Sequence, residues 1–313
     1  MSRPLLGLHH VTATVDRAQP DLDFCERALG LRLVKRTVNF DNHNVYHFYY
    51  GTETGAPGTI WTTFPYHGWG VPVGIHGAGQ IGATAFSVPA GAVDAWRDRL
   101  RDAGLAPADG APRFSEHPLV VRDPSGLVLE LVPTPDDARP AWPGGPVEPA
   151  MAVRGLHSVT LVLRDRTRTL ALMTGRLAFE VVDEMPGRTR LACGGRTAGH
   201  LVDLVESPEA PQAKNGLGTV HHVAFAIGSA EAQLALRSQL LEDGLQVTEV
   251  RDRTYFQSIY FREPGGVLFE VATTSPGFTY DEPAGRLGQA LKLPPWEEPH
   301  RAAIEAALPR LDR

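Results

Sequence analysis

Apolar and polar side chains alternate along several short segments of the chain, a pattern typical of β-strands packed on one face. The segments predicted as strands are residues 6–15, 32–40, 44–50, 59–64, 81–88, 127–132, 156–163 and 220–227. Apolar residues at helical spacing predict helices at residues 21–29, 92–103, 230–243 and 297–307. The order of the elements predicts an α+β fold of four tandem β-α-β-β-β units followed by a C-terminal helix.

Turn-forming residues divide the chain into two parts. Residues 133–149 are dense in Pro, Gly and Asp, which is typical of a linker. The predicted parts are an N-terminal half at residues 1–133, a linker at 134–153, a C-terminal half at 154–276 and an extension with a helix at 277–313. With two units in each half of the chain, we expect two barrel-like halves.

Internal repeats relate the four units to one another. The matched segments are residues 7–12 with 155–160, 82–86 with 221–225, and 122–130 with 262–270. The first unit is therefore related to the third, and the second unit to the fourth.

The related units differ at positions that carry chemistry. His10 is matched by Ser158 and His222 by Ala83, whereas Glu270 is matched by another carboxylate, Glu130. A histidine that serves only packing has no reason to occur in one copy and to be absent from its relative. The contrast indicates a site that one set of units retains and the other lacks.

Alternation along the two His-His strands predicts where these side chains point. His10 falls on one face with Thr12, opposite His9, and His222 falls on a face with small residues, opposite His221. Two imidazoles and one carboxylate with open positions are the ligand set of non-haem Fe(II) oxygenases. The predicted ligands are His10, His222 and Glu270. The alternative is that both pairs are half-buried histidines with hydrogen-bonded rings.

The ligand positions also predict how the units associate. One ligand lies in the first unit and two lie in the fourth, so these two units have to share a barrel. The second and third units then form a barrel without the metal. We expect the C-terminal helix to lie outside both.

Composition limits the partners. The chain has 313 residues, 42% of them hydrophobic, and a net charge of −6 with no basic stripe for nucleic acid. Cys25 and Cys193 are the only cysteines and form no C-x-x-C motif, which favours a reducing cytoplasm. No apolar run approaches the roughly 20 residues that span a bilayer, and the first residues lack a signal-peptide pattern. We expect a soluble cytoplasmic protein that binds a small molecule.

With these features the chain resembles the vicinal oxygen chelate superfamily, which includes glyoxalases, extradiol dioxygenases and resistance proteins. More narrowly, it resembles the hydroquinone dioxygenases and their ring-cleaving relatives. The segments that carry the resemblance are residues 8–12, 34–38, 58–65, 221–226, 253–260, 264–270 and 277–282. The resemblance implies Fe(II), with Mn(II) as the alternative, on the three ligands given above. A homodimer is the assembly expected for this superfamily.

The resemblance also implies residues around the metal. His9 and His221 are implied as proton carriers near the substrate, and the alternative is that their rings orient the strands. Tyr260 is implied to hydrogen-bond the substrate or bound oxygen, and its repeat counterpart is the apolar Val120.

Two further residues are implied as substrate-binding. They are Thr12 and Arg253, but Arg253 is matched by Arg113 in the related unit, which leaves a structural role open. The remaining histidines, His43, His47, His67, His76, His117, His157, His200 and His300, are expected to be mostly surface or structural residues.

The implied activity is ring cleavage of a hydroquinone or a related dihydroxylated aromatic, with O2 as the second substrate. One alternative is a glyoxalase-like isomerase that uses Ni(II) or Zn(II) and four protein ligands. Residues 59–64 contain no carboxylate to serve as the fourth ligand, which counts against it. The other alternative is a metal-free resistance protein that binds an aromatic compound.

Overall fold

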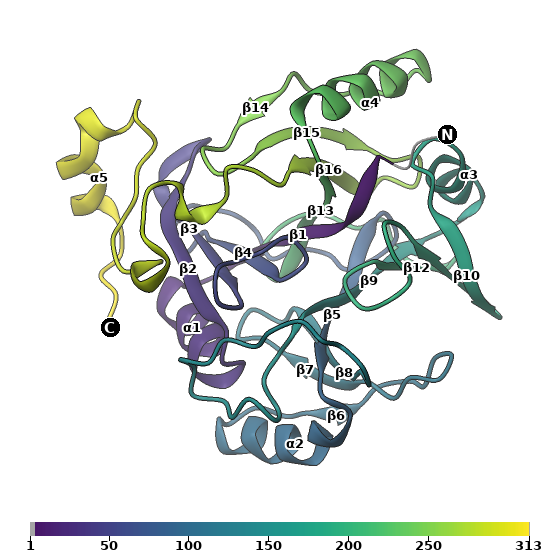
Figure 1. Cartoon of the computed structure of the whole chain (residues 1–313), viewed down its shortest axis with the longest axis horizontal. Helices are drawn as coiled ribbons and strands as arrows, with labels where there is room; N and C mark the ends of the chain where they lie inside the picture. Colours follow the sequence, from purple (N-terminus) through teal and green to yellow (C-terminus); the bar gives the residue numbers. More distant parts are fainter. Residues whose placement is uncertain (1–3, 313) are drawn as a thin grey trace.

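The computed structural model describes residues 4–312, and the chain folds into the predicted units (Figure 1). The first unit contains β1 (Leu5–Val15), α1 (Ala18–Asp23), β2 (Arg32–Asn39), β3 (Asn42–Gly51) and β4 (Ile60–Pro65). The second contains β5 (Gln80–Val88), α2 (Val93–Asp102), β6 (Ala108–Asp109), β7 (Leu119–Arg122) and β8 (Val128–Pro133). The third contains β9 (Gly155–Leu163), α3 (Thr167–Gly175), β10 (Glu180–Met185), β11 (Arg188–Ala192) and β12 (Leu201–Glu206). The fourth contains β13 (Thr219–Ile227), α4 (Ala230–Glu242), β14 (Arg251–Asp252), β15 (Gln257–Arg262) and β16 (Leu268–Thr273).

The strands form two eight-stranded half-barrels, which confirms the predicted α+β fold. The strand orders are β14-β15-β16-β13-β1-β4-β3-β2 and β10-β11-β12-β9-β5-β8-β7-β6. The first sheet thus combines the first and fourth units, and the second sheet combines the second and third, as predicted. Antiparallel pairs at the centre of each sheet, β1 with β13 and β5 with β9, join the units. Each half of the chain contributes to both sheets, and the domain boundaries drawn above stay a prediction.

Strict alternation breaks in β1 at the His-His pair. Leu8 and Val11 both lie in the hydrophobic core, with the two histidines between them. The register with β13 shifts between Leu8 and His10, so His9 is the additional residue of a β-bulge. Strict alternation, which sets His9 and Val11 on one face opposite His10, therefore does not hold here, and that part of the prediction is wrong. Leu8 takes that place in the core, and His9 contacts the ring of Phe256, as His10 does.

The other central strands repeat this bulge. Val220 and Val223 of β13 both lie in the core, and His221 is the additional residue between them. In the second sheet the additional residues are Gly82 on β5 and His157 on β9. The bulge is therefore common to all four units, whereas the histidine that follows it occurs in only two of them.

The first and the last predicted helix differ from their predicted bounds by several residues, whereas α2 and α4 differ by at most one residue at either end. The helix predicted at residues 21–29 begins three residues earlier as α1 and continues as a π-helical segment, Phe24–Ala28. The backbone N–H of Leu29 donates to the carbonyl of Phe24, five residues before it, at 2.9 Å. The C-terminal helix is α5 (Arg301–Ala307), preceded by a 3-10 turn, and it lies outside both sheets (Figure 1). Within residues 4–312, no helix combines the length and apolar character needed to cross a membrane.

A carboxyl group is buried between α1 and the first sheet. Asp21 is 2% exposed, and its Oδ2 accepts hydrogen bonds from the hydroxyls of Tyr50 at 2.8 Å and Thr63 at 2.6 Å. Burial raises the pKa of Asp21 to about 7 against the opposing effect of these hydrogen bonds, and the charge of Asp123 adds to the increase. The folded protein therefore holds a proton at Asp21 that the unfolded chain releases near pH 4.

Asp21→Asn should remove a pH dependence of stability. Between about pH 4 and 7 the unfolded chain loses the proton and the folded protein keeps it, so Asp21 lowers the free energy of unfolding as pH rises. Two pH units correspond to about 3 kcal/mol. The asparagine carbonyl can accept the same two hydrogen bonds. The free energy of unfolding of the variant should therefore not show this decrease with pH.

Urea unfolding at pH 5 and at pH 7 measures this effect as the difference in the free energy of unfolding between wild type and Asp21→Asn. Asp23→Asn, on the same helix, is the control, because the Asp23 side chain is 40% exposed. An equal wild-type-to-variant difference at both pH values would show that Asp21 does not titrate in this range.

Candidate metal centre

Strand pairing brings three predicted site residues to one place. His10 on β1 is opposite Ala224 on β13, and Ala224 is opposite Glu270 on β16. His222, also on β13, is opposite Thr12. Paired residues point to the same face of a sheet, so the two imidazoles and the carboxylate converge. The methyl side chain of Ala224 leaves the space between them open.

The three side chains form a compact triangle. His222 Nε2 lies 2.8 Å from Glu270 Oε2, and His10 Nε2 lies 3.2 Å from the same oxygen. The two Nε2 atoms are 3.2 Å apart. Neighbouring ligands of an octahedral ion with bonds of about 2.1 Å are separated by about 3 Å. The triangle therefore has the size of one face of such an ion's coordination shell.

The charge state of the group also suits a cation. Burial alone would raise the pKa of Glu270, but the adjacent His10 and His222 hold it well below its usual value. Burial lowers the pKa of His222 against the opposing effect of Glu270. Glu270 Oε2 is buried and has no donor aligned for a hydrogen bond. A divalent metal requires deprotonated ligands such as these and would satisfy the unpaired oxygen.

Neighbouring side chains hold each member of the triangle. His9 Nδ1 lies 2.9 Å from His10 Nδ1, and His221 Nδ1 lies 2.7 Å from His222 Nδ1. Each of these pairs directs the Nε2 atom of the second ring toward Glu270. The hydroxyl of Ser258 donates to the other carboxylate oxygen, Glu270 Oε1. Such contacts fix the orientation and tautomer of metal ligands.

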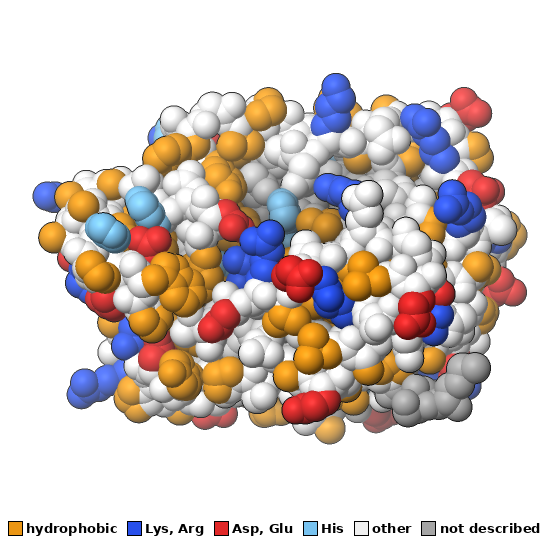
Figure 2. All heavy atoms as spheres, turned by 90° about the horizontal axis from the view of Figure 1, so that it is seen from above, with side chains coloured by type: hydrophobic (Ala, Val, Ile, Leu, Met, Phe, Trp, Pro, Cys, Tyr) orange, Lys and Arg blue, Asp and Glu red, His pale blue; other side chains and the backbone are white. Residues whose placement is uncertain are grey.

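A cavity of about 280 Å³ opens onto the triangle. Its lining residues are His10, Thr12, Asn39, Phe40, Asp41, His47, Tyr49, Phe64, Tyr66, His221, His222, Arg253, Phe256, Tyr260 and Glu270. The predicted site residues are thus brought together, except that His9 lies behind His10 and outside the cavity. Thr12 accepts a hydrogen bond from Thr62 at 2.8 Å. Figure 2 shows a hollowed surface where acidic and basic side chains are interspersed and a histidine is visible.

Tyr260 and Arg253 form one unit at the edge of the triangle. Tyr260 is opposite Glu270 in the strand register, and its hydroxyl accepts a hydrogen bond from Arg253 Nε at 3.1 Å. Burial, and then the charge of Glu270, raises the pKa of Tyr260, so the phenol keeps its proton. Arg253 also approaches Asp41 at 3.7 Å. These contacts hold the phenol at the cavity wall.

Residues 7–131 and 155–271 match the family described as the Glyoxalase/Bleomycin resistance protein/Dioxygenase superfamily. The chain belongs to this superfamily. It is 40% identical over 308 residues to "Putative ring-cleaving dioxygenase MhqO" of Bacillus subtilis (strain 168), covering 98% of this chain and 97% of that protein. It is 35% identical over 297 residues to "Chlorohydroquinone/hydroquinone 1,2-dioxygenase" of Sphingobium indicum, covering 92% and 91%.

Solved structures of the superfamily agree with the fold. A crystal structure titled as a putative dioxygenase from Bacillus subtilis has a TM-score of 0.94 and 39% identity, and the match covers 99% of each chain. Glyoxalase I from Zea mays has a TM-score of 0.64 at 14% identity, covering 86% of this chain and 92% of that one. The second likeness shows the superfamily fold alone.

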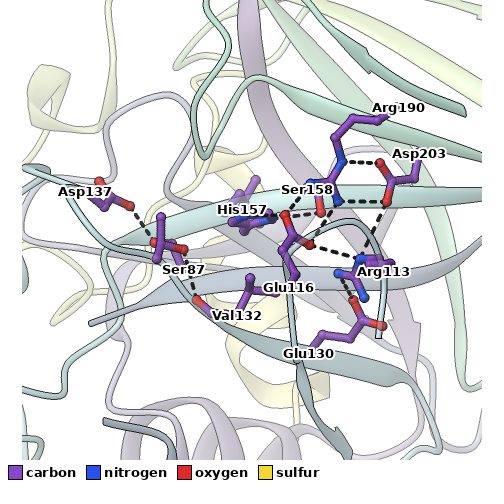
Figure 3. Close-up of polar contacts among 12 residues, drawn as sticks. Ser87, Arg113, Glu116, Glu130, Val132, Asp137, His157, Ser158, Arg190 and Asp203 are labelled. Atoms are coloured by element: carbon purple, nitrogen blue, oxygen red, sulfur yellow. Dashed lines mark hydrogen bonds and ion pairs between the residues drawn. The ribbon is translucent and has the colours of Figure 1, made fainter. Parts of the chain in front are cut away.

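The second sheet of this superfamily member carries arginines at the corresponding place (Figure 3). Arg113 reaches Glu130 at 2.5 Å and lies 3.6 Å from Asp203. Arg190 pairs with Asp203 at 2.7 Å and also with Glu116. Guanidinium groups therefore compensate the buried carboxylates here, since an unpaired buried charge is very costly. The positions of the two imidazoles are taken by serine and alanine, as the repeat indicates.

Ser258 and His47 are among the polar side chains of the site that sequence reasoning missed. Ser258 lies two residues before Tyr260 on the same strand, so alternation would have placed it beside Tyr260. His47 is grouped above with histidines expected to be mostly surface or structural, but its ring lines the cavity. The available signal was its position two residues before Tyr49 in an aromatic strand.

His10→Ser should separate metal binding from folding. The related strand has Ser158 at the same place, buried and hydrogen-bonded to His157. We expect the free energy of unfolding of the metal-free variant to lie within about 1 kcal/mol of that of the metal-free wild type. Its Fe(II) content after anaerobic loading should fall by an order of magnitude or more, because a ligand contributes more than the 10- to 100-fold typical of outer-shell partners.

Metal analysis and thermal unfolding of the metal-free proteins test both parts. Ser158→Ala is the matched control and should keep full iron content. Full iron content in His10→Ser would show that His10 is no ligand. If His10→Ser does not fold, His10 has a structural role.

Proposed function

We propose that this protein is an Fe(II)-dependent, extradiol-type ring-cleaving dioxygenase that acts on a hydroquinone or a related dihydroxylated aromatic. The observation that carries the proposal is the buried His10, His222 and Glu270 triangle facing an aromatic-lined cavity. The names of the relatives, which include a hydroquinone dioxygenase and ring-cleaving dioxygenases, support it. Mn(II) is the alternative metal, since the same ligand types can hold it.

The protein residues would bind and orient the reactants. A bound Fe(II) would supply the electron transfer between phenolate and O2 that ring cleavage requires, with both oxygen atoms entering the product. The rings of Phe64 and Phe256 would hold the aromatic substrate. The protonated phenol of Tyr260, with Arg253 behind it, would donate a hydrogen bond to a substrate or dioxygen oxygen. Thr12 would bind the substrate through its hydroxyl.

His9 and His221 would take different parts in this reaction. His221 lines the cavity, so of the two predicted proton carriers it is the one that could meet the substrate hydroxyl, and it would do so through Nε2 because its Nδ1 faces Nδ1 of His222. His9 has its ring against His10 and lies outside the cavity, which supports an orienting role for it. This assignment favours His221 over His9 as the proton carrier.

The isomerase alternative receives little support from the register. Thr62 on β4 is opposite Thr12, two residues after His10, just as Glu270 is opposite Ala224, two residues after His222. A fourth carboxylate ligand from β4 would have to stand at this position, and Thr62 is a buried threonine whose hydroxyl donates to Thr12. The expected homodimer and the cytoplasmic location stay predictions.

Oxygen uptake by the protein loaded anaerobically with Fe(II) tests the proposal. We expect O2 consumption with hydroquinones and a ring-opened product that carries both oxygen atoms from labelled O2. The comparison substrates are catechol and a mixture of methylglyoxal with a thiol. Conversion of methylglyoxal without O2 uptake would instead identify an isomerase. Binding of hydroquinone without conversion of any substrate would identify a resistance-type binding protein.

Tyr260→Phe should lower turnover and leave iron bound. The substitution removes one hydroxyl and keeps the ring that packs edge-on to His222 at a centroid distance of 5.8 Å. We expect kcat to fall by about 10- to 100-fold, as for loss of an outer-shell partner. Steady-state kinetics together with iron analysis measure this. Tyr280→Phe is the control, because Tyr280 is 67% exposed. Unchanged kcat in Tyr260→Phe would rule out a catalytic part for the hydroxyl.

A further inference from the structure

His47 lies in the cavity wall with its ring held between two aromatic side chains. The centroid of its ring is 4.0 Å from that of Tyr49 and 4.2 Å from that of Phe64. The residue belongs to β3, which is two strands from β1 in the sheet order. Two strand spacings are roughly 10 Å. His47 therefore faces the cavity from the side opposite to β16 and Glu270.

Hydroxyl groups fix the orientation of this ring. His47 Nε2 lies 3.1 Å from the hydroxyl oxygen of Thr62, and that hydroxyl donates to Thr12 at 2.8 Å. Since the hydrogen of Thr62 is used toward Thr12, Nε2 carries its own hydrogen and donates to Thr62. The second ring nitrogen, Nδ1, is then an acceptor. Within residues 4–312, Thr62 is the hydrogen-bond partner that the structure gives this imidazole, so Nδ1 remains for a ligand.

The ring is uncharged. Burial, and then the nearby His10, lowers the pKa of His47 well below its usual value. A neutral imidazole with Nε2 protonated accepts one hydrogen bond at Nδ1, and a hydroxyl group is the matching donor. A substrate hydroxyl would also give the second ring nitrogen a hydrogen-bond partner.

Several other polar groups of the cavity already have partners. Tyr260 and Arg253 bond to each other beside Glu270, at the metal end. The amide of Asn39 donates to the hydroxyl of Tyr66 at 2.6 Å. Asp41 also lines the cavity, but its side chain is 66% exposed and lies near Arg251 and Arg253. His47 thus offers a neutral acceptor on the wall opposite to β16 and Glu270.

We propose that His47 accepts a hydrogen bond from the substrate hydroxyl that lies far from the metal. The two hydroxyls of a para-dihydroxy ring point in opposite directions, so a ring bound to the metal through one oxygen carries the other to the far wall. His47 then selects para-dihydroxy rings over rings with a single hydroxyl. This inference rests on the proposed function, because it takes the metal end of the substrate as given.

His47→Phe tests the selection. Phenylalanine keeps an aromatic ring between Tyr49 and Phe64 but has no acceptor. The readout is the ratio of anaerobic dissociation constants of the Fe(II)-loaded protein for hydroquinone and for 4-methylphenol, which lacks the second hydroxyl. We expect the preference for hydroquinone to fall by about tenfold, as for loss of one hydrogen bond in a buried site. Affinity for 4-methylphenol and iron content should not change.

Two further variants sharpen the result. His47→Gln keeps an acceptor and should retain most of the preference. His43→Phe, on the same strand, is the control, because the His43 side chain is 44% exposed and lies against Glu297 outside the cavity. An unchanged ratio in His47→Phe, or an equal loss of affinity for both ligands, would overturn the assignment of His47.

The outcomes for His47 and for the proposed function are distinct. Hydroquinone that binds to the wild type without O2 uptake, together with a shifted ratio in His47→Phe, would overturn the dioxygenase proposal and support the His47 assignment. O2 uptake on hydroquinone with an unchanged ratio would overturn the His47 assignment alone. A wild type that does not bind hydroquinone would overturn both.

Discussion

The antiparallel pairing of β1 with β13 is the contact on which the site depends. It places His10 and His222 on neighbouring strands although they are 212 positions apart in the chain. The bulges at His9 and His221 then set the preceding ring of each pair against the ring that faces Glu270. One irregularity of the backbone thereby supplies a facing ring and a ring that orients it.

The two sheets accommodate a buried carboxylate in different ways. Each carries a buried carboxylate on its closing strand, Glu270 on β16 and Glu130 on β8. In the second sheet, Arg113 compensates the charge from within the protein. In the first sheet the corresponding arginine, Arg253, bonds to Tyr260 instead, so the carboxylate is left facing two imidazoles. The exchange of Val120 for Tyr260 between the repeats is thus coupled to the availability of the carboxylate.

The sequence predicted what depends on repeats and local pattern. The strand units, the exchange of units between sheets and the convergence of His10 with His222 followed from comparison of related segments. The direction of His9 did not follow, because a bulge shifts alternation by one residue and leaves no mark in composition. The position of His47 and the burial of Lys35 at 0% exposure could not be read either. Both depend on partners brought close by tertiary packing, such as Asp281 for Lys35.

The exchange of units between sheets has a consequence for synthesis on the ribosome. The second and third units follow one another directly, so β5 and β9 can pair as soon as the third unit has emerged. The first unit emerges before either of them, yet β1 has to wait for β13 at residues 219–227. Until then one side of β1 has no partner strand, and an unpaired strand edge promotes aggregation. The first part of the chain to be synthesised is therefore the last to be completed. A chain that stops before the fourth unit retains His10 but cannot assemble the candidate metal centre.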